Sequence, residues 1–539
     1  MAVEEQTNTI PLLDQLDTKA TKRIGDITVA NVTEDLMVHK PPISFEEIPG
    51  PALLKLLDKY WKYVPLLGTQ LFRSVLINRL TEGRLTWNRN IRPLKYLFNE
   101  YGPVVRLNGP FAGDIVLIHR PEHIAKVFEE EGDSPTRSGI DVLQHYRLNY
   151  RKYRFSGPYN SQGLQSMQWL QTKKVLETPI AKQINKEFEK FEMACDELLI
   201  RIRQIKNRQD EVSGDFSNEL SRWSMECFWI FMISKKIGFL DSTSYNKNSE
   251  ITRFIETLAT AHHYMSRCET GFQFWRMIDT PYSKKLFSAC DIIDGIIGKY
   301  IRNAQSHVRN NLSMHEDENQ HRLTILENLL FKQRMNPEEL ATLLMDMIIL
   351  GVNATTNSQA FLLYYLAKNP RIQRRLHEEV ISKTPKDHSF TSKTFIDMPY
   401  LNACINECLR LRPAFPYITR LLSKQIILHG YKIPKGTYII MANQISSQRE
   451  ENFEDPDKFK PDRWLKSSDD SYPQNSYLPF GKGIRNCIGE NLAKLEMMLL
   501  TIKIIREFII EYDYADIESR FLMMNVPDRP LRFRFISRN

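Results

Sequence analysis

The chain has 539 residues, of which 42% are hydrophobic and 26% are charged, and its formal net charge is +8. This balance is ordinary for a globular protein that can bury a large core. Lysine and arginine form no stripe with interleaved aromatic residues, so nucleic-acid binding has little support. The seven cysteines are odd in number, scattered and without a Cys-x-x-Cys pair, which argues against a disulfide framework and favours a reducing compartment.

Residues 1–44 are expected to form a polar, poorly ordered leader, followed by one catalytic domain over 45–539. The first 50 residues contain four Lys or Arg and nine Asp or Glu. Mitochondrial transit peptides are rich in arginine and poor in acids, so this stretch does not look like one. No apolar stretch approaches the roughly 18–20 residues needed to span a bilayer. The segment 343–352, which carries Asp346, is predicted to be a buried helix.

Beyond the leader the sequence predicts many helices and a few small sheets. Residues 103–107 and 114–119 flank a Gly-containing turn, which indicates an early hairpin. Long helical tracts are expected from about 165 to 380, a second β-rich patch over 424–441, and an edge strand over 531–535. The predicted strands and helices do not alternate in a βαβ order. The predicted fold class is therefore mainly α (α+β), in one large domain.

The segment YLPFGKGIRNCIGE, residues 477–490, places Cys487 just before a helical pattern. The free N–H groups and the dipole of a helix start favour a thiolate. The surrounding glycines let the backbone fold close beneath a flat ligand. Arg485, two residues earlier, is able to reach an anionic group at the edge of that ligand. A thiolate in these surroundings suits axial ligation of haem iron.

Three other interpretations of the Cys487 loop compete with this one. A phosphate-binding loop would need the pattern GxxxxGK[ST], which is missing here. A hydrolase nucleophile would need a general base, and the segment contains no histidine. A structural, buried thiol is the usual fate of a lone cysteine. That role would not explain why Phe480, three glycines and Arg485 occur together.

Residues 480–489 match, at every defined position, the haem-binding signature of the cytochrome P-450 family, which the chain resembles from residue 45 to its end. The resemblance implies the mainly helical fold of that family, a haem b with Cys487 as its axial ligand, and a monooxygenase activity that uses O2. It also assigns cofactor contacts to four further residues of the motif: Phe480, Gly481, Arg485 and Gly489.

Other segments extend the resemblance. The family's Glu-x-x-Arg pair corresponds to Glu407 and Arg410, and Arg463 of FKPDRW would complete a buried Glu-Arg-Arg triad. Such a network needs all its members, because an unpaired buried charge is costly. Its implied role is structural, since it holds the segment that presents the cysteine loop.

The resemblance places three more residues at the edge of the haem: Arg420, Trp169 and Lys173. The family usually has Trp-x-x-x-Arg where this chain has Trp169 and Lys173. Lysine keeps the positive charge of that arginine but cannot form the two parallel hydrogen bonds that a guanidinium group makes.

The segments FEEIPGP (45–51), EEEGDSPTR (129–137) and MPYLNACINECLRLRP (398–413) resemble the animal, insect-like mitochondrial branch of the family. That branch implies a ferredoxin-type electron donor and a lipophilic, sterol-like substrate. It also implies a location at the matrix side of the mitochondrial inner membrane, although no N-terminal signal is evident. Peripheral membrane contact is expected from the aromatic segment 270–277, unless that segment packs inward.

The surface that receives the electron donor departs from the branch pattern. Asn402 and Asn406 stand where lysines that dock an acidic ferredoxin are expected, and Glu490 and Asn491 stand where two arginines are common. Neutral substitution at the protein surface would explain each of these changes taken singly.

A second departure lies in the helix that activates oxygen. Its usual Ala-Gly-x-Asp-Thr-Thr is replaced by LGVNATT, residues 350–356, so Asn353 takes the place of the acid and Ala354 that of the first threonine. An acid–alcohol pair normally relays protons through ordered water. Thr355 lies roughly 100° further round the helix and replaces Ala354 only if the helix bulges. Asn353, Ala354 and Thr355 are therefore the candidate catalytic positions.

Three functions remain open on these grounds. The first is a ferredoxin-fed monooxygenase of a lipophilic substrate. The second is a haem-thiolate isomerase or lyase that rearranges an oxygenated lipid without external electrons. The third is a non-catalytic haem or sterol binder. Candidate residues of the substrate pocket are Met345, Ile349, Phe415 and Tyr417.

Overall fold

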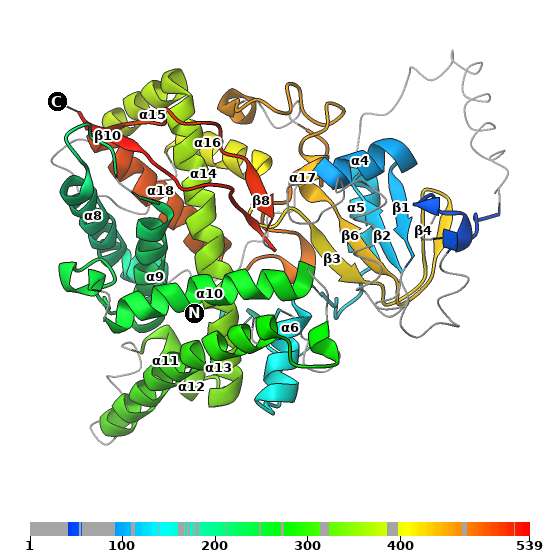
Figure 1. The fold of residues 1–539 in the computed structure, drawn as a ribbon, viewed down its shortest axis with the longest axis horizontal. Helices are drawn as coiled ribbons and strands as arrows, with labels where there is room; N and C mark the ends of the chain where they lie inside the picture. Colours follow the sequence, from blue (N-terminus) through cyan, green and yellow to red (C-terminus); the bar gives the residue numbers. More distant parts are fainter. Residues whose placement is uncertain are drawn as a thin grey trace, which may run out of the picture. The chain divides into compact units, whose positions relative to one another are not determined.

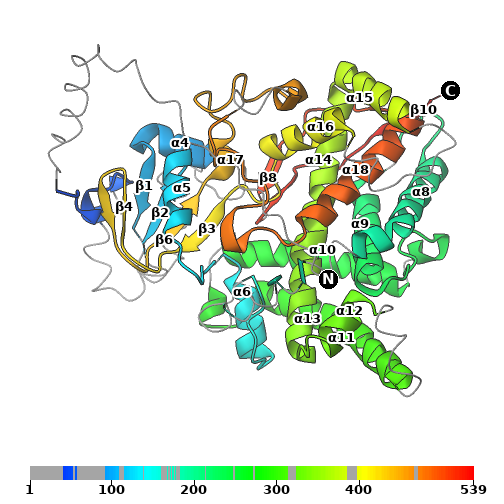
Figure 2. The same ribbon diagram turned by 180° about the vertical axis from the view of Figure 1, so that it is seen from behind.

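The computed structural model describes residues 41–52, 55–56, 92–108, 114–137, 139–159, 167, 170, 173–174, 176–177, 183–212, 214–246, 249–270, 274–312, 323–384, 397–465, 472–521 and 523–538. The chain separates into two compact units, Met1–Ile43 and Ser44–Asn539. The predicted leader therefore lies almost wholly outside the described residues. In the second unit, the helices and small sheets predicted from the sequence are confirmed (Figures 1 and 2).

Helices make up most of the second unit. Their bounds, in chain order, are α4 Arg92–Tyr101, α5 Pro121–Glu129, α6 Asp141–His145, α8 Phe188–Ile205, α9 Ser217–Ile233, α10 Glu250–Thr270, α11 Pro281–Leu312, α12 Ile325–Phe331, α13 Pro337–Asp346, α14 Asn353–Lys368, α15 Pro370–Lys383, α16 Pro399–Leu411, α17 Asn443–Ser446 and α18 Glu490–Glu507. Two π-helical segments, Tyr146–Tyr150 and Met347–Val352, follow α6 and α13 directly.

The larger sheet has four strands in the order β1-β2-β6-β3, and α4 and α5 lie beside it (Figure 1). Its strands are β1 Val104–Leu107, β2 Ile115–Ile118, β3 Ile418–Leu421 and β6 Tyr438–Met441. The antiparallel pairing of β1 with β2 confirms the early hairpin. Strand β6 runs parallel to β2, and β3 runs antiparallel to β6 with Arg420 opposite Ile439. The sheet thereby fixes the position of Arg420.

Three further strand pairs complete the β structure, all antiparallel. They are β4 Ile426–Leu428 with β5 Tyr431–Ile433, β7 Phe508–Glu511 with β10 Arg534–Ser537, and β8 Ser519–Phe521 with β9 Asn525–Pro527. The β4–β5 turn consists of His429 and Gly430, with φ angles of 49° and 80°, as a two-residue type I′ turn requires. The edge strand predicted over 531–535 begins three residues later than expected.

The helix Pro337–Lys368, formed by α13, the π-helical segment and α14, runs through the core. Among the described residues it is the one helix whose length and composition would allow it to cross a membrane. It is longer than the apolar run expected from the sequence. However, 72% of its most apolar window is buried inside the protein, so it packs as the predicted core helix. Helix α18 lies beside it and is buried on all sides over residues 495–505 (Figure 2).

Candidate active site

A cavity of about 300 Å³ lies among α9, the helix Pro337–Lys368, β3, the loop before α18 and α18 itself. Its wall is largely apolar and includes Phe228, Phe231, Leu350, Phe415 and Leu478. Polar and charged side chains meet it at a few places only. A concave apolar site with few polar groups is the usual form of a small-molecule site.

The thiol of Cys487 is exposed to this cavity, whereas the other six cysteines of the chain are buried. The Cys487 N–H donates to the carbonyl of Phe480 at 2.9 Å, which closes the loop just before α18. Desolvation raises the pKa of Cys487, while the N–H of Gly489 and the charge of Arg137 act in the opposite direction. The N–H at the helix start therefore acts in the expected direction, and desolvation of the thiol acts against it. A bound metal cation would favour the thiolate further.

Two of the three loop glycines are required by the backbone. Gly481 and Gly483 have φ angles of +74° and +75°, which side chains of L-residues rarely adopt. Gly489 has room for a Cβ, whose nearest neighbour would be the Cys487 sulfur at 3.9 Å.

Three arginines line one part of the cavity: Arg137, Arg420 and Arg485. The Arg485 Nε donates to the carbonyl of Pro135 at 2.9 Å, and its Nη1 donates to that of Pro158 at 3.0 Å. Burial and the neighbouring Arg137 and Arg420 lower the pKa of Arg485 to about 9. Cations held this close together favour an anionic ligand at this edge.

Arg137 was not assigned a role from the sequence. Its guanidinium lies over the ring of Tyr159, 5.1 Å from the centroid, and its buried Nε has no hydrogen-bond partner among the described residues. Burial lowers its pKa. The only available signal was its place in the segment EEEGDSPTR, which pointed to the branch of the family but not to a cavity.

Lys173 supports the cysteine loop instead of lining the cavity. Its Nζ donates to the carbonyl of Ile484 at 2.9 Å and to the side chain of Asn486, and it pairs with Glu177 at 3.6 Å. The structure thus shows the ammonium group of Lys173 bound to the loop, and Lys173 is not among the residues that line the cavity. Trp169, the other member of that motif, lies outside the described residues.

The described residues fit haem. An axial donor is exposed in an apolar cavity, which is also lined by three arginines: two are buried, and the third is half-buried with an orphaned Nε. The sequence profile of the cytochrome P-450 family matches residues 74–532.

This chain belongs to the cytochrome P-450 family.

Curated relatives agree with this assignment. The Drosophila melanogaster protein named probable cytochrome P-450 12a5, mitochondrial, is 30% identical over 91% of this chain and 90% of its own length. The Drosophila protein named probable cytochrome P-450 12c1, mitochondrial, is 31% identical over 81% of this chain and 84% of its own. The mouse 1,25-dihydroxyvitamin D(3) 24-hydroxylase, mitochondrial, is 27% identical over 81% of this chain and 82% of its own.

As a cytochrome P-450, the protein is an oxidoreductase of the monooxygenase class and binds haem b through the thiolate of Cys487. Membership in a family of enzymes leaves the non-catalytic haem binder without support. The haem cofactor with its cysteine thiolate ligand and the fold class were therefore predicted correctly from the sequence.

The helix of this cytochrome P-450 that carries the altered oxygen-activating motif is locally π-helical over Met347–Val352. Ala354 and Thr355 both line the cavity just after this segment, and Asn353 does not. The Asn353 side chain turns back along the helix, where its Nδ2 donates to the carbonyl of Ile349 at 2.8 Å.

The substrate-pocket candidates divide in two. Phe415 and Tyr417 line the cavity, as expected. Met345 and Ile349 do not, since both are buried in the main hydrophobic cluster. From this part of the helix, Leu343, Met347 and Leu350 line the cavity instead.

The aromatic segment near residue 275 is divided between core and surface. Trp275 is buried and donates its Nε1–H to the carbonyl of Cys268 at 2.9 Å. Phe274, Met277 and Ile278 are exposed. Phe272 lies outside the described residues.

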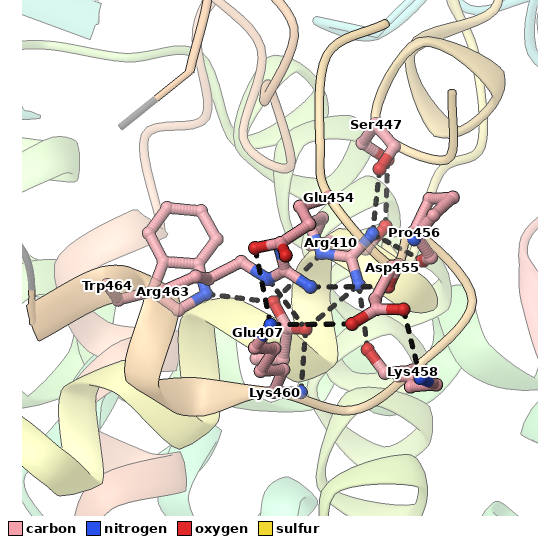
Figure 3. Close-up of polar contacts among 10 residues, drawn as sticks. All are labelled: Glu407, Arg410, Ser447, Glu454, Asp455, Pro456, Lys458, Lys460, Arg463 and Trp464. Carbon is pink, nitrogen blue, oxygen red and sulfur yellow. Dashed lines mark hydrogen bonds and ion pairs between the residues drawn. The ribbon is translucent and has the colours of Figure 1, made fainter. Parts of the chain in front are cut away.

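Glu407 and Arg410 on α16 are fully buried, and Arg463 joins them from the segment that precedes the cysteine loop (Figure 3). The Glu407 carboxylate accepts bonds from Arg410 Nε and Nη2 at 2.8 and 2.9 Å and from Arg463 Nε at 3.1 Å. The backbone N–H of Lys460 and the indole of Trp464 each donate to it at 2.9 Å. Trp464 was missed in the sequence, although it directly follows Arg463.

Removing the Glu407 charge should destabilise the protein. Glu407→Ala leaves two arginines without their buried partner, at a cost of about 3–5 kcal/mol. We expect the variant to be largely haem-free and to unfold at lower denaturant concentration, as measured by circular dichroism and haem content. Glu454→Gln is the matched control, because Glu454 is exposed and pairs only with Lys460 among the described residues of this region. Wild-type stability and haem content in Glu407→Ala would contradict the structural role.

Proposed function

We propose that this cytochrome P-450 inserts one oxygen atom from O2 into a lipophilic, sterol-like substrate, with electrons from a ferredoxin-type donor. The observation that carries the proposal is the apolar wall of the cavity to which the Cys487 thiol is exposed. The haem supplies the activation of dioxygen. The wall supplies an apolar surface that orients a substrate and excludes water. One relative is named a hydroxylase of 1,25-dihydroxyvitamin D(3), which supports the substrate class.

The contacts of the cofactor are proposed in two groups. Arg420, Arg485 and Arg137 line the cavity and would hold the haem propionates by charge-assisted bonds. Phe480 and Gly481 also line the cavity and would form the bed beneath the flat ring. The bonds of Lys173 support a role in bracing the loop from behind.

Thr355 is the proposed proton-relay residue. It replaces Ala354 only where the helix departs from regular α geometry, and the π-helical segment Met347–Val352 meets that condition. Its side chain belongs to the cavity lining. The Asn353 amide donates to the Ile349 carbonyl and has no titrating proton, so a water molecule would have to supply the proton.

The location of the protein is proposed from its relatives and its surface. Several relatives carry the word mitochondrial in their names, and we extend this location, at the matrix side of the inner membrane, to this chain. Four exposed apolar side chains, Phe274, Met277, Ile278 and Tyr282, lie close together in the sequence. They support peripheral contact with the membrane surface.

A second function is favoured by the helix that carries Asn402 and Asn406. Asn406 accepts a bond from the Tyr477 hydroxyl at 3.2 Å, and Asn402 donates to the carbonyl of Met398 at 2.9 Å. Lys494 is paired with Glu490 at 2.6 Å. Lys482 is exposed and donates to the Asn475 side chain at 2.8 Å, so it keeps its charge without an acidic partner among the described residues. The positive charge that this surface offers to an acidic donor is therefore reduced. A haem-thiolate isomerase or lyase that acts on an oxygenated lipid would need none.

The proton relay is tested by the product formed per reductant consumed. Thr355→Ala should lower this ratio by about tenfold or more, because one well-placed donor contributes roughly 10²–10⁴-fold in such steps. Adding Asn353→Asp with Ala354→Thr should restore it by returning the acid–alcohol pair. Thr356→Ala is the control, because Thr356 is 4% exposed and does not line the cavity. An unchanged ratio in Thr355→Ala would contradict the relay, and turnover without reductant would favour the isomerase.

The electron donor is tested at Asn402, because Asn406 is needed by Tyr477. Asn402→Lys should raise the rate of reduction by a ferredoxin several-fold at low salt, and the gain should disappear at high salt, since it is an effect of charge steering. Asn402→Gln is the uncharged control. The measurement is stopped-flow reduction under carbon monoxide. Equal rates for the three proteins at low salt would show that a donor does not dock on this face.

A further inference from the structure

A carboxylate is built into the arginine cluster of the cavity. Glu131 follows α5 and is 8% exposed. Its Oε2 accepts a bond from Arg420 Nε at 2.5 Å, across 289 positions of sequence. Neither the signature of the cysteine loop nor the residues assigned to the haem edge include it.

We propose that Glu131 is a positioning residue, which aims Arg420 at the haem propionates and sets the net charge at that edge of the haem. The proposal needs only that the protein binds haem, and not the substrate or the electron donor proposed above.

The orientation of Arg420 follows from its bonds. Its Nε is held by Glu131, and its Nη1 donates to the carbonyl of Thr419 at 2.9 Å. Among the described residues, no partner is seen for its Nη2. Since Arg420 lines the cavity, the nitrogen left over is the one available to a ligand there. A guanidinium fixed at two nitrogens loses little entropy when the third binds an anion.

The surroundings of Glu131 are shaped to admit this carboxylate. A Cβ at Gly483 would lie 2.5 Å from Glu131 Oε1, so the cysteine loop leaves room for it. The backbone carbonyl of Glu131 accepts a bond from the Ser423 hydroxyl at 3.4 Å. Glu131 therefore joins the end of α5, the segment after β3 and the loop of Cys487.

The charges at this edge match those of the cofactor. Arg137, Arg420 and Arg485 line the cavity, and Glu131 is the carboxylate paired with one of them. Three guanidiniums and one carboxylate leave two positive charges, and the two propionates of haem b carry two negative charges. Two acids line the cavity itself: Asp346 is already paired with Arg147 at 2.6 Å, and burial raises the pKa of Glu496 well above its usual value, which favours its neutral form. Without Glu131, haem would sit beside one excess positive charge.

Two variants separate the effect of the Glu131 charge from the effect of its side-chain length. Glu131→Gln keeps an acceptor for Arg420 and removes the charge, so the reduction potential should become more positive while haem loss stays near the wild-type rate. Glu131→Asp keeps the charge but is too short for Arg420, so haem loss should become about tenfold faster or more, with a potential near that of the wild type. Glu130→Gln is the control, because Glu130 pairs with Lys126 and Lys424 at the surface.

The potential is measured by titration with a chemical reductant, and haem loss by transfer to an excess of apomyoglobin. Neither readout needs a substrate or a ferredoxin, so a failure of the proposed function would not affect them. Wild-type potential in Glu131→Gln, or wild-type haem loss in Glu131→Asp, would overturn the proposal. If a variant does not load haem, circular dichroism of the cofactor-free protein distinguishes a positioning role of Glu131 from a purely structural one. A folded variant supports positioning, and an unfolded one shows a purely structural role.

Discussion

The buried carboxylate of Glu407 is the constraint on which the active site depends. It lies at zero exposure and accepts bonds from Arg410 and Trp464, from Arg463, and from the backbone of Lys460 (Figure 3). A charge taken out of water is stable only when all its partners are in place. Helix α16 and the segment that leads into the cysteine loop therefore assemble together, and the thiol cannot reach the cavity unless that segment is held.

The wall of the cavity has two kinds of surface. Apolar side chains from α9, the upstream part of the helix Pro337–Lys368, the loop before α18 and α18 itself form most of the wall, while the arginines meet at one edge. The apolar wall suits a flat, largely apolar ring, and the arginine edge suits the two anionic groups of that ring. Glu131 belongs to the same design, because it compensates part of the arginine charge before any cofactor arrives.

Much of this was visible in the sequence, and what was missed has physical causes. The Cys487 loop and the early hairpin are local patterns that could be read from the residues, whereas the Glu407 triad, which joins segments 56 positions apart, followed from the resemblance to the family. The contact between Glu131 and Arg420 joins distant segments, and no periodicity reports it. The face that the core helix turns to the cavity depends on tertiary packing, because Leu343 lines the cavity and Met345, two residues later, does not. The direction of the Cys487 pKa shift depends on burial, which the sequence of the loop does not contain.

The central claim is that Cys487 is the axial ligand of the haem, and the absorption spectrum of the reduced, CO-bound protein tests it most directly. The wild type should show the strongly red-shifted Soret band of thiolate ligation. Cys487→Ala should lose that band, whereas Cys408→Ala should keep it, because Cys408 is buried on α16 away from the cavity lining. A red-shifted band that persists in Cys487→Ala would contradict the account.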